Sequence, residues 1–76
     1  MDTLNRLQEI FRDVFDDEEL IISLNTSDVD IEDWSSLTQI AIITACEVEF
    51  GMKFDVTEIP GIKTVSDFIK IIEKHQ

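Results

Sequence analysis

The chain has 76 residues, and its 17 acidic side chains against 6 basic ones give it a net charge of −11. A chain of this length forms one small domain, here residues 1–76, and has little room for a deep catalytic pocket with a supporting shell. The charge argues against binding to nucleic acid or to anionic membranes, because phosphate groups need basic partners, and it favours partner proteins with basic surfaces.

The first predicted helix covers residues 3–15. Its apolar side chains recur at intervals of three and four residues, which is typical of one buried helical face. They are Leu4, Leu7, Ile10, Phe11, Val14 and Phe15. Residues 1–4 lack the basic and apolar regions of a signal peptide, and no apolar run approaches the ~20 residues of a membrane span. We therefore expect a monomeric, cytoplasmic protein without membrane insertion.

A long connection, residues 16–35, follows without predicted regular structure. Its acidic start, residues 16–19, is expected to be solvated, whereas apolar side chains further on should hold the loop against the core. These side chains are Leu20, Ile21, Ile22, Leu24 and Ile31. Connections of this length are often functional. The acidic run 28–33 resembles a calcium loop, but Asp33 stands where that loop needs glycine and Gln39 where it needs glutamate. We therefore expect no dedicated metal site, and only weak cation binding at this charge cluster stays open.

The second predicted helix covers residues 36–50, with Ser35 or Asp33 as its N-cap and Gly51 as its stop signal. Residues 35–46 carry no charge. A core stripe is expected at Leu37, Ile40, Ile43 and Phe50. Other apolar residues fall at different angles, namely Ile42, Ala45 and Val48. A helix that is apolar on several faces is either central to the fold or presents an apolar strip to a partner.

The remaining chain is predicted to hold a short helical turn near residues 56–60, ended by Pro60 and Gly61. A last helix follows, and it starts at a capping box formed by Thr64 and Asp67. The apolar stripe of this last helix comprises Val65, Phe68, Ile69 and Ile72. Strand-like alternation is weak throughout the chain. The sequence therefore predicts an all-α fold, a small four-helix bundle of three main helices plus one short helix.

Ser36 is the candidate functional residue, because a helix N-terminus presents free backbone N–H groups and a partial positive charge that suit a phosphate. A nucleophilic serine would need a base, and the single histidine, His75, stands next to the C-terminus. The local sequence by itself favours a plain capping role for Ser35 and Ser36. The wider pattern along the chain instead indicates that Ser36 accepts a modification.

Other candidate reactive residues are interpreted as structural. Cys46 lacks the basic neighbour that activates a thiol, and we expect it to be buried and inert. Glu47 and Glu49 are two residues apart on a helix and point in different directions, so they are surface charges rather than a paired acid–base site. Trp34 is expected to pack the loop.

An ordered set of features runs along the chain. The acidic loop leads into Asp33-Trp34-Ser35-Ser36-Leu37, the second helix ends in Glu47-Val48-Glu49-Phe50-Gly51, and residues 62–67 lead into the last helix. Together with the short length and the acidic charge, this set resembles the acyl carrier proteins, a phosphopantetheine-binding carrier family, over about residues 3–74. The resemblance implies a four-helix bundle that catalyses nothing.

The resemblance also implies a site and its partners. A phosphopantetheinyl transferase would move 4′-phosphopantetheine from coenzyme A onto Ser36. The terminal thiol of that arm would hold acyl groups as thioesters, in fatty-acid, polyketide or other specialised biosynthesis. Acyl-loading and acyl-processing enzymes with basic or apolar docking patches would dock along the second helix. The expected contact residues are Asp33, Leu37, Ala41, Ile42, Ala45, Glu47 and Glu49.

The chain departs from the family pattern at two places. Ser35 replaces the aspartate that usually precedes the attachment serine, and Thr38 and Ala41 are neutral where carriers of fatty-acid synthesis are usually acidic. We therefore expect a specialised carrier with more apolar partner contacts. Two alternatives stay open at this point. One is an unmodified carrier-like domain acting as a protein-interaction module, and the other is a small hydrolase or metal protein, against which the missing base and ligands argue.

Overall fold

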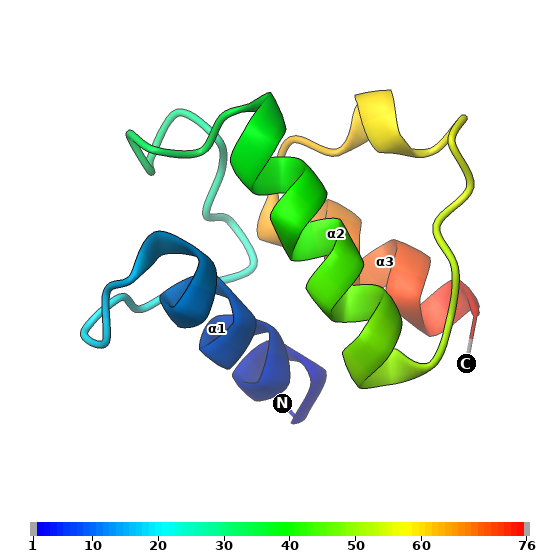
Figure 1. Cartoon of the computed structure of the whole chain (residues 1–76), viewed down its shortest axis with the longest axis horizontal. Helices are drawn as coiled ribbons and strands as arrows, with labels where there is room; N and C mark the ends of the chain where they lie inside the picture. The colour runs from blue at the N-terminus through cyan, green and yellow to red at the C-terminus, as the bar shows by residue number, and fades with distance from the viewer. Residues whose placement is uncertain (1, 76) are drawn as a thin grey trace.

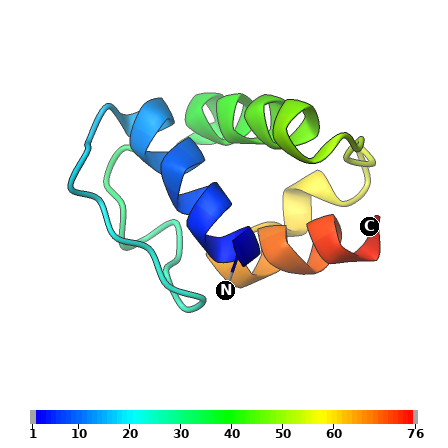
Figure 2. The same cartoon turned by 90° about the horizontal axis from the view of Figure 1, so that it is seen from below.

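The computed structural model describes residues 2–75. The chain forms the helices α1 (Asp2–Phe15), α2 (Ser36–Phe50) and α3 (Val65–Lys74), and a short 3-10 helix, η1 (Ile59–Gly61), lies between α2 and α3 (Figure 1). The turned view shows α2 and α3 on opposite sides of the molecule, with η1 between them at one end (Figure 2). Within residues 2–75 the only pairing of β type is an isolated bridge between Ser27 and Thr64. The predicted all-α fold of three main helices plus one short helix is therefore confirmed.

Helix α1 buries the face that its periodicity predicts. Leu7 and Phe11 are fully buried and Ile10 nearly so, and α1 packs against α2. The other predicted apolar positions are half-buried at the edge of the core; they are Leu4, Val14 and Phe15. The Phe11 ring lies 5.3 Å from the Trp34 ring and 6.0 Å from the Phe68 ring, both edge to face, so it joins the long loop and α3 to α1.

Helix α2 turns a different face inward from the one we predicted. Its buried residues are Ile42, Ile43, Cys46 and Phe50. The prediction is right for Ile43 and Phe50 but wrong for Leu37 and Ile40, whose side chains are 81% and 58% exposed. Residues on nearly every side of the first three turns of α2 are uncharged, so hydrophobic periodicity does not fix its rotation. Packing against α1 and α3 selects the face.

Both ends of α2 carry the predicted signals. Ser35 is the N-cap, and its N–H donates to Thr38 Oγ1 at 2.7 Å, while the Thr38 hydroxyl donates to the Asp33 carbonyl oxygen at 2.9 Å. At the other end, Gly51 adopts a left-handed conformation with φ of 62°, and its N–H donates to the Glu47 carbonyl oxygen. The helix therefore ends where glycine allows the chain to reverse.

The long connection is held to α3 by backbone hydrogen bonds. Val65 and Ser66, at the start of α3, donate their N–H groups to the carbonyl oxygens of Thr26 (2.8 Å) and Leu24 (3.2 Å). The Asp28 N–H donates to the Lys63 carbonyl oxygen at 2.9 Å. The first N–H groups of a helix have no partner within the helix, so the loop carbonyls satisfy them. We call residues 24–28 the strap.

The apolar residues of the connection divide between inside and outside. Ile22 is buried, and its N–H donates to Gln8 Oε1 at 3.0 Å. Leu20 and Ile31 are half-buried against the core, as predicted. Ile21 and Leu24 are 78% and 43% exposed, so the prediction that they hold the loop is wrong. Neighbouring side chains of an extended segment point to opposite sides, and burying Ile22 leaves Ile21 outside.

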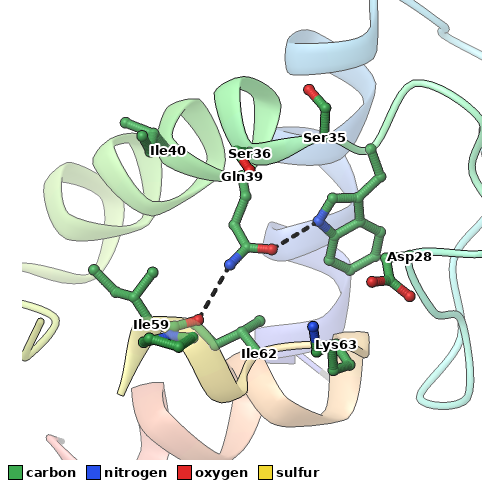
Figure 3. Close-up of a pocket in the computed structure, with 10 residues that line it drawn as sticks. Asp28, Ser35, Ser36, Gln39, Ile40, Ile59, Ile62 and Lys63 are labelled. Carbon is green, nitrogen blue, oxygen red and sulfur yellow. Dashed lines mark hydrogen bonds between the residues drawn. The ribbon is translucent and has the colours of Figure 1, made fainter. Parts of the chain in front are cut away.

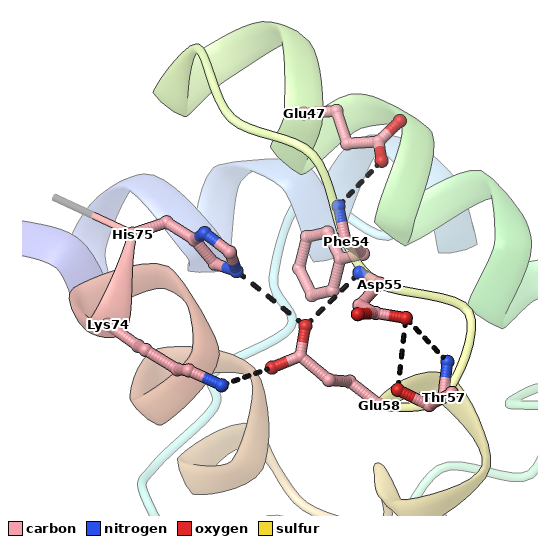
Figure 4. A network of polar contacts seen from close by, with 7 residues as sticks. All are labelled: Glu47, Phe54, Asp55, Thr57, Glu58, Lys74 and His75. Atoms are coloured by element: carbon pink, nitrogen blue, oxygen red, sulfur yellow. Dashed lines mark hydrogen bonds and ion pairs between the residues drawn. The ribbon is translucent and has the colours of Figure 1, made fainter.

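The segment between α2 and α3 is held by a polar network at the C-terminal end of α3 (Figure 4). Glu58 Oε1 accepts the Asp55 N–H at 3.1 Å and lies 3.6 Å from His75 Nε2, while Glu58 Oε2 accepts from the Lys74 ammonium at 3.2 Å. The Asp55 N–H, followed by Lys74 and His75, lowers the pKa of Glu58. The helical turn comes slightly later than predicted, because Pro60 lies within η1 rather than ending it.

Helix α3 matches its prediction closely. The predicted stripe is buried, and it comprises Val65, Phe68, Ile69 and Ile72. Asp67 Oδ2 accepts the N–H groups of Lys63 (2.8 Å) and Thr64 (3.0 Å), while the Asp67 N–H donates to Thr64 Oγ1 at 3.1 Å. This capping box fixes the chain as it leaves η1, and so it positions residues 59–63 opposite the start of α2.

Candidate functional site

A pocket of about 440 Å³ lies between the N-terminal half of α2 and the segment around η1 (Figure 3). Its lining residues are Asp28, Trp34, Ser35, Ser36, Gln39, Ile40, Ile59, Pro60, Ile62 and Lys63. Figure 3 shows Ile40 and Ile59 at one end of the pocket and Asp28 and Lys63 at the other. One end is therefore apolar, and the other carries one negative and one positive charge.

Ser36 is the first residue of α2 and lies exposed at this pocket. The N-cap position belongs to Ser35, so the Ser36 side chain is not committed to capping. The first backbone N–H of α2 that forms a helical hydrogen bond is that of Gln39, which donates to the Ser35 carbonyl oxygen at 2.9 Å. The preceding N–H groups of the first turn have no partner within the helix, and they give this end of α2 its partial positive charge.

The pocket brings Ser36 together with Trp34, as expected from their closeness in sequence, and with Lys63 from the far side of η1. Trp34 is only 7% exposed and its ring stacks 6.0 Å from the Phe68 ring, which confirms its predicted packing role. His75 lies away from Ser36, beside Glu58 at the end of α3. The structure therefore does not supply the histidine that a hydrolytic serine would use.

Gln39 is a residue of this pocket that sequence reasoning missed, as it missed Lys63. Its Oε1 accepts the Trp34 indole N–H at 3.0 Å, and its Nε2 donates to the Ile59 carbonyl oxygen at 3.2 Å (Figure 3). The side chain thus joins α2 to the loop and to η1. One sequence signal could have found it: Gln39 is a polar residue on the same side of α2 as Ile42 and Ile43, three and four residues on.

The predicted partner contacts on α2 differ in their exposure. Asp33, Leu37 and Ala41 are exposed, and Ala45 is half-buried. Ile42 has an exposed fraction of 0%, so its expected role as an apolar contact for partners is wrong and it is a core residue instead. Ile42 faces the core because its position falls on the side of α2 that packs inward, together with Cys46 and Phe50.

The two predicted acidic contacts, Glu47 and Glu49, are engaged within the chain. Glu47 accepts the Phe54 N–H at 2.9 Å, and Glu49 pairs with the Arg6 guanidinium at 2.9 Å. The Arg6 guanidinium also lies 4.3 Å from the centre of the Phe50 ring. These carboxylates therefore fasten neighbouring segments to the end of α2, and part of their charge is neutralised.

A row of exposed, uncharged residues runs along α2 from the position next to Ser36. Its members follow the three- and four-residue spacing of one side of a helix, with Ile40 and Ala41 next to each other in the middle; they are Leu37, Ile40, Ala41, Thr44 and Val48. We call this row the uncharged stripe. Large apolar side chains that gather on a surface mark sites of interaction. The exposed apolar surface of α2 is therefore formed by this stripe and not by Ile42.

The single cysteine is buried, as predicted. Burial, followed by the charges of Glu49 and Glu47, raises the pKa of the Cys46 thiol to about 12, so the thiolate is scarce at neutral pH. Within residues 2–75, no cluster of three or more His, Cys, Asp or Glu residues is arranged to hold a metal ion. Within the same range, each helix is too short or too polar to cross a membrane.

A sequence comparison and a structure comparison both match this chain to acyl carrier proteins. The chain is 31% identical over 72 residues to an acyl carrier protein of Lactobacillus acidophilus, and the match covers 95% of this chain and 90% of that protein. Its fold is similar to the solution NMR structure of holo acyl carrier protein from Geobacter metallireducens, with a TM-score of 0.89 and 37% identity, covering 99% of this chain and 86% of the other. No family model matches the chain.

Proposed function

The chain belongs to the acyl carrier protein family, and on that premise we propose that it carries acyl groups as thioesters on a 4′-phosphopantetheine arm attached to Ser36. Proteins of this family are carriers and not enzymes, so the chain is a carrier. The observation that supports Ser36 is its position as an exposed residue at the start of α2, with Ser35 taking the capping role.

The residues around Ser36 fit a phosphodiester. A phosphate on Ser36 Oγ would lie against the free N–H groups of the first turn of α2, where a negative charge is stabilised. Lys63 is the cationic side chain among the residues that line the pocket. When attached, the arm would supply a terminal thiol to hold the acyl group. The chain itself would contribute the acceptor hydroxyl, the helix N-terminus and the surface that enzymes recognise.

We further propose that the phosphopantetheinyl transferase and the acyl-loading and acyl-processing enzymes dock on the uncharged stripe. Any enzyme that reaches Ser36 must cover the surface around it, and Leu37 is the adjacent residue, 81% exposed. Asp33, on the other side of Ser36, offers a charge to a basic partner. The neutral Thr38 and Ala41 support service in a specialised pathway rather than general fatty-acid synthesis. The monomeric state and the cytoplasmic location stay predictions.

The attachment residue is tested by intact-protein mass after incubation with coenzyme A and a broad-specificity phosphopantetheinyl transferase. Wild type and Ser35→Ala should each gain one phosphopantetheinyl group, and Ser36→Ala should gain none while keeping the wild-type circular dichroism spectrum. Ser35→Ala is the matched control, because it removes the neighbouring hydroxyl. A gain in Ser36→Ala would contradict the assignment. No gain in wild type would favour the alternative function, an unmodified interaction module that binds through the uncharged stripe.

The docking surface is tested in the same reaction by kcat/KM for modification. Leu37→Ser should lower kcat/KM, because it removes an exposed apolar side chain next to Ser36. Val56→Ser is the control, since Val56 is 77% exposed but lies on the connection after α2. Equal values for the two variants would show that the transferase does not use the stripe. If a fatty-acid synthase elongated the modified protein as well as its own carrier, the specialised role would be contradicted.

A further inference from the structure

Gln39 is a polar residue on the inward side of α2. The residues that follow on this side are all apolar and buried; they are Ile42, Ile43, Cys46 and Phe50. Gln39 itself is half-buried and lines the pocket that Ser36 also lines. It therefore stands at the boundary between this pocket and the apolar core of the protein.

Both polar atoms of the Gln39 amide are engaged across the pocket. Gln39 Oε1 accepts the Trp34 indole N–H at 3.0 Å, and Gln39 Nε2 donates to the Ile59 carbonyl oxygen at 3.2 Å (Figure 3). The side chain therefore bridges the loop and η1. Trp34 is itself held, because its ring packs against the rings of Phe11 and Phe68. Displacing the amide would leave a buried indole N–H and a backbone carbonyl without partners, which is unfavourable.

The rest of the pocket would attract an alkyl chain. Ile40 and Ile59 form its apolar end, and Ile62, which is 2% exposed, lies between Ile59 and Lys63 along its side (Figure 3). An acyl group attached at Ser36 can contact these side chains from outside. To go further, toward Ile43 and Cys46, it would have to pass Gln39.

We propose that Gln39 is the specificity-determining residue of this pocket, and that it confines the carrier to short acyl groups by barring longer alkyl chains from the core. The inference rests on the proposed attachment at Ser36. On this proposal, the Gln39 side chain determines how long an acyl group the protein can shelter. Longer chains stay on the surface, where partner enzymes and water reach them.

The test uses a Ser36→Cys variant, so that it needs neither a transferase nor phosphopantetheine and can succeed where the proposed function fails. Ethyl, hexyl or decyl methanethiosulfonate labels the introduced thiol: its thiolate attacks the reagent sulfur, a disulfide bond forms and methanesulfinate leaves. Cys46 is fully buried with its pKa raised to about 12, so labelling is selective, and intact mass verifies a single label. The measurement is the midpoint of thermal unfolding, Tm.

With Gln39 in place, the three labels should give Tm values within about 1 °C of one another. The double variant Ser36→Cys, Gln39→Met keeps the length of the side chain at position 39 but removes the amide. In this variant Tm should rise by at least about 4 °C from the ethyl to the decyl label, because the longer alkyl chain becomes buried. Gln8→Met is the matched control, because Gln8 is also half-buried and bonds the Ile22 N–H. Losing the hydrogen bond from the Ile22 N–H to Gln8 should lower Tm by the same amount for every label.

Two results would overturn the proposal: a rise of Tm with label length while Gln39 is present, or no such rise in Gln39→Met. A merely structural tie would lower Tm equally for every label. If Gln39→Met does not fold, the indole N–H resonance of Trp34, the single tryptophan, decides the question in Ser36→Cys alone. We expect its position to be the same for ethyl and decyl labels, and a shift with the decyl label would show that the Trp34–Gln39 bond yields.

Discussion

Replacing Ile42 or Leu37 by alanine removes three side-chain carbons from the same helix, yet the two changes should differ several-fold in their effect on stability. Ile42 is fully buried, whereas Leu37 is 81% exposed. The pair therefore tests which face of α2 is turned inward. It also tests which residues of α2 are free to meet a partner, because Ile42 was expected at that surface.

The magnitudes follow from burial. Ile42→Ala loses the transfer free energy of its buried carbons and leaves a cavity, so it should cost about 2–5 kcal/mol. Leu37 buries only about a fifth of its surface, and losing that part of a 1.5–3 kcal/mol contribution costs about 0.3–0.6 kcal/mol. The higher helix propensity of alanine offsets some of this smaller cost. A domain of this size has a total stability of about 4–11 kcal/mol, so Ile42→Ala removes a large share of it.

The assay is urea unfolding followed by far-ultraviolet circular dichroism. With m of about 1–3 kcal/mol/M, Ile42→Ala should lower the unfolding midpoint by about 1 M or more, and Leu37→Ala should leave it close to the wild-type value. The slope m should be unchanged in both variants, so that the midpoints report stability. Equal losses of stability in the two variants, or a larger loss in Leu37→Ala, would refute the conclusion that the Ile42 side of α2 faces the core.

Three further predictions follow from single residues. Gly51→Ala should cost about 1–2 kcal/mol in urea unfolding, because Gly51 has a φ of 62° and no neighbour within 4 Å of an added Cβ, so the strain is purely conformational. Gly61→Ala is its control and should be neutral or slightly stabilising, and equal losses would contradict the argument. Burial tends to raise the pKa of Asp67, but the N–H groups of Lys63 and Thr64 outweigh it and lower the pKa. This stabilisation is present above the ordinary pKa of about 3.9 and is lost as pH falls through the lower folded value, so Asp67→Asn should lose less Tm than wild type on acidification. The Cys46 thiol should react with a thiol reagent near pH 8 only in proportion to the unfolded fraction in urea, and rapid labelling of the folded protein would show that it is accessible.

Helices α1 and α3 could be predicted from sequence because polar residues outline their apolar stripes. In α2 the same reasoning fails at Leu37 and Ile40, since the uncharged run 35–46 offers apolar residues on several sides. The rotation of such a helix is decided by the shapes that it packs against. Those shapes come from α1 and α3, which no local pattern in α2 describes.

The position of Ser36 in the fold was predictable because local signals define it. Ser36 could be placed at the start of α2 because Ser35 and Asp33 are residues that cap helices and stand just before an apolar run. Gln39 could not be identified as part of a bridge, because one of its partners is the backbone oxygen of Ile59, twenty residues away in the chain. A backbone oxygen is present at every position, so sequence gives no sign of which one will be used.

The strap has a consequence for how the surface of this protein can change over generations. Leu24 and Thr26 hold the loop to α3, and Asp28 holds it to Lys63 just before α3, through backbone atoms that nearly every amino acid supplies. Leu24 and the neighbouring Asn25 point their side chains into solvent, so substitutions there leave the attachment intact. Mutation can therefore change the exposed side chains of this loop while α1, α2 and α3 keep their packing. Related proteins can in this way acquire new recognition surfaces without losing the fold.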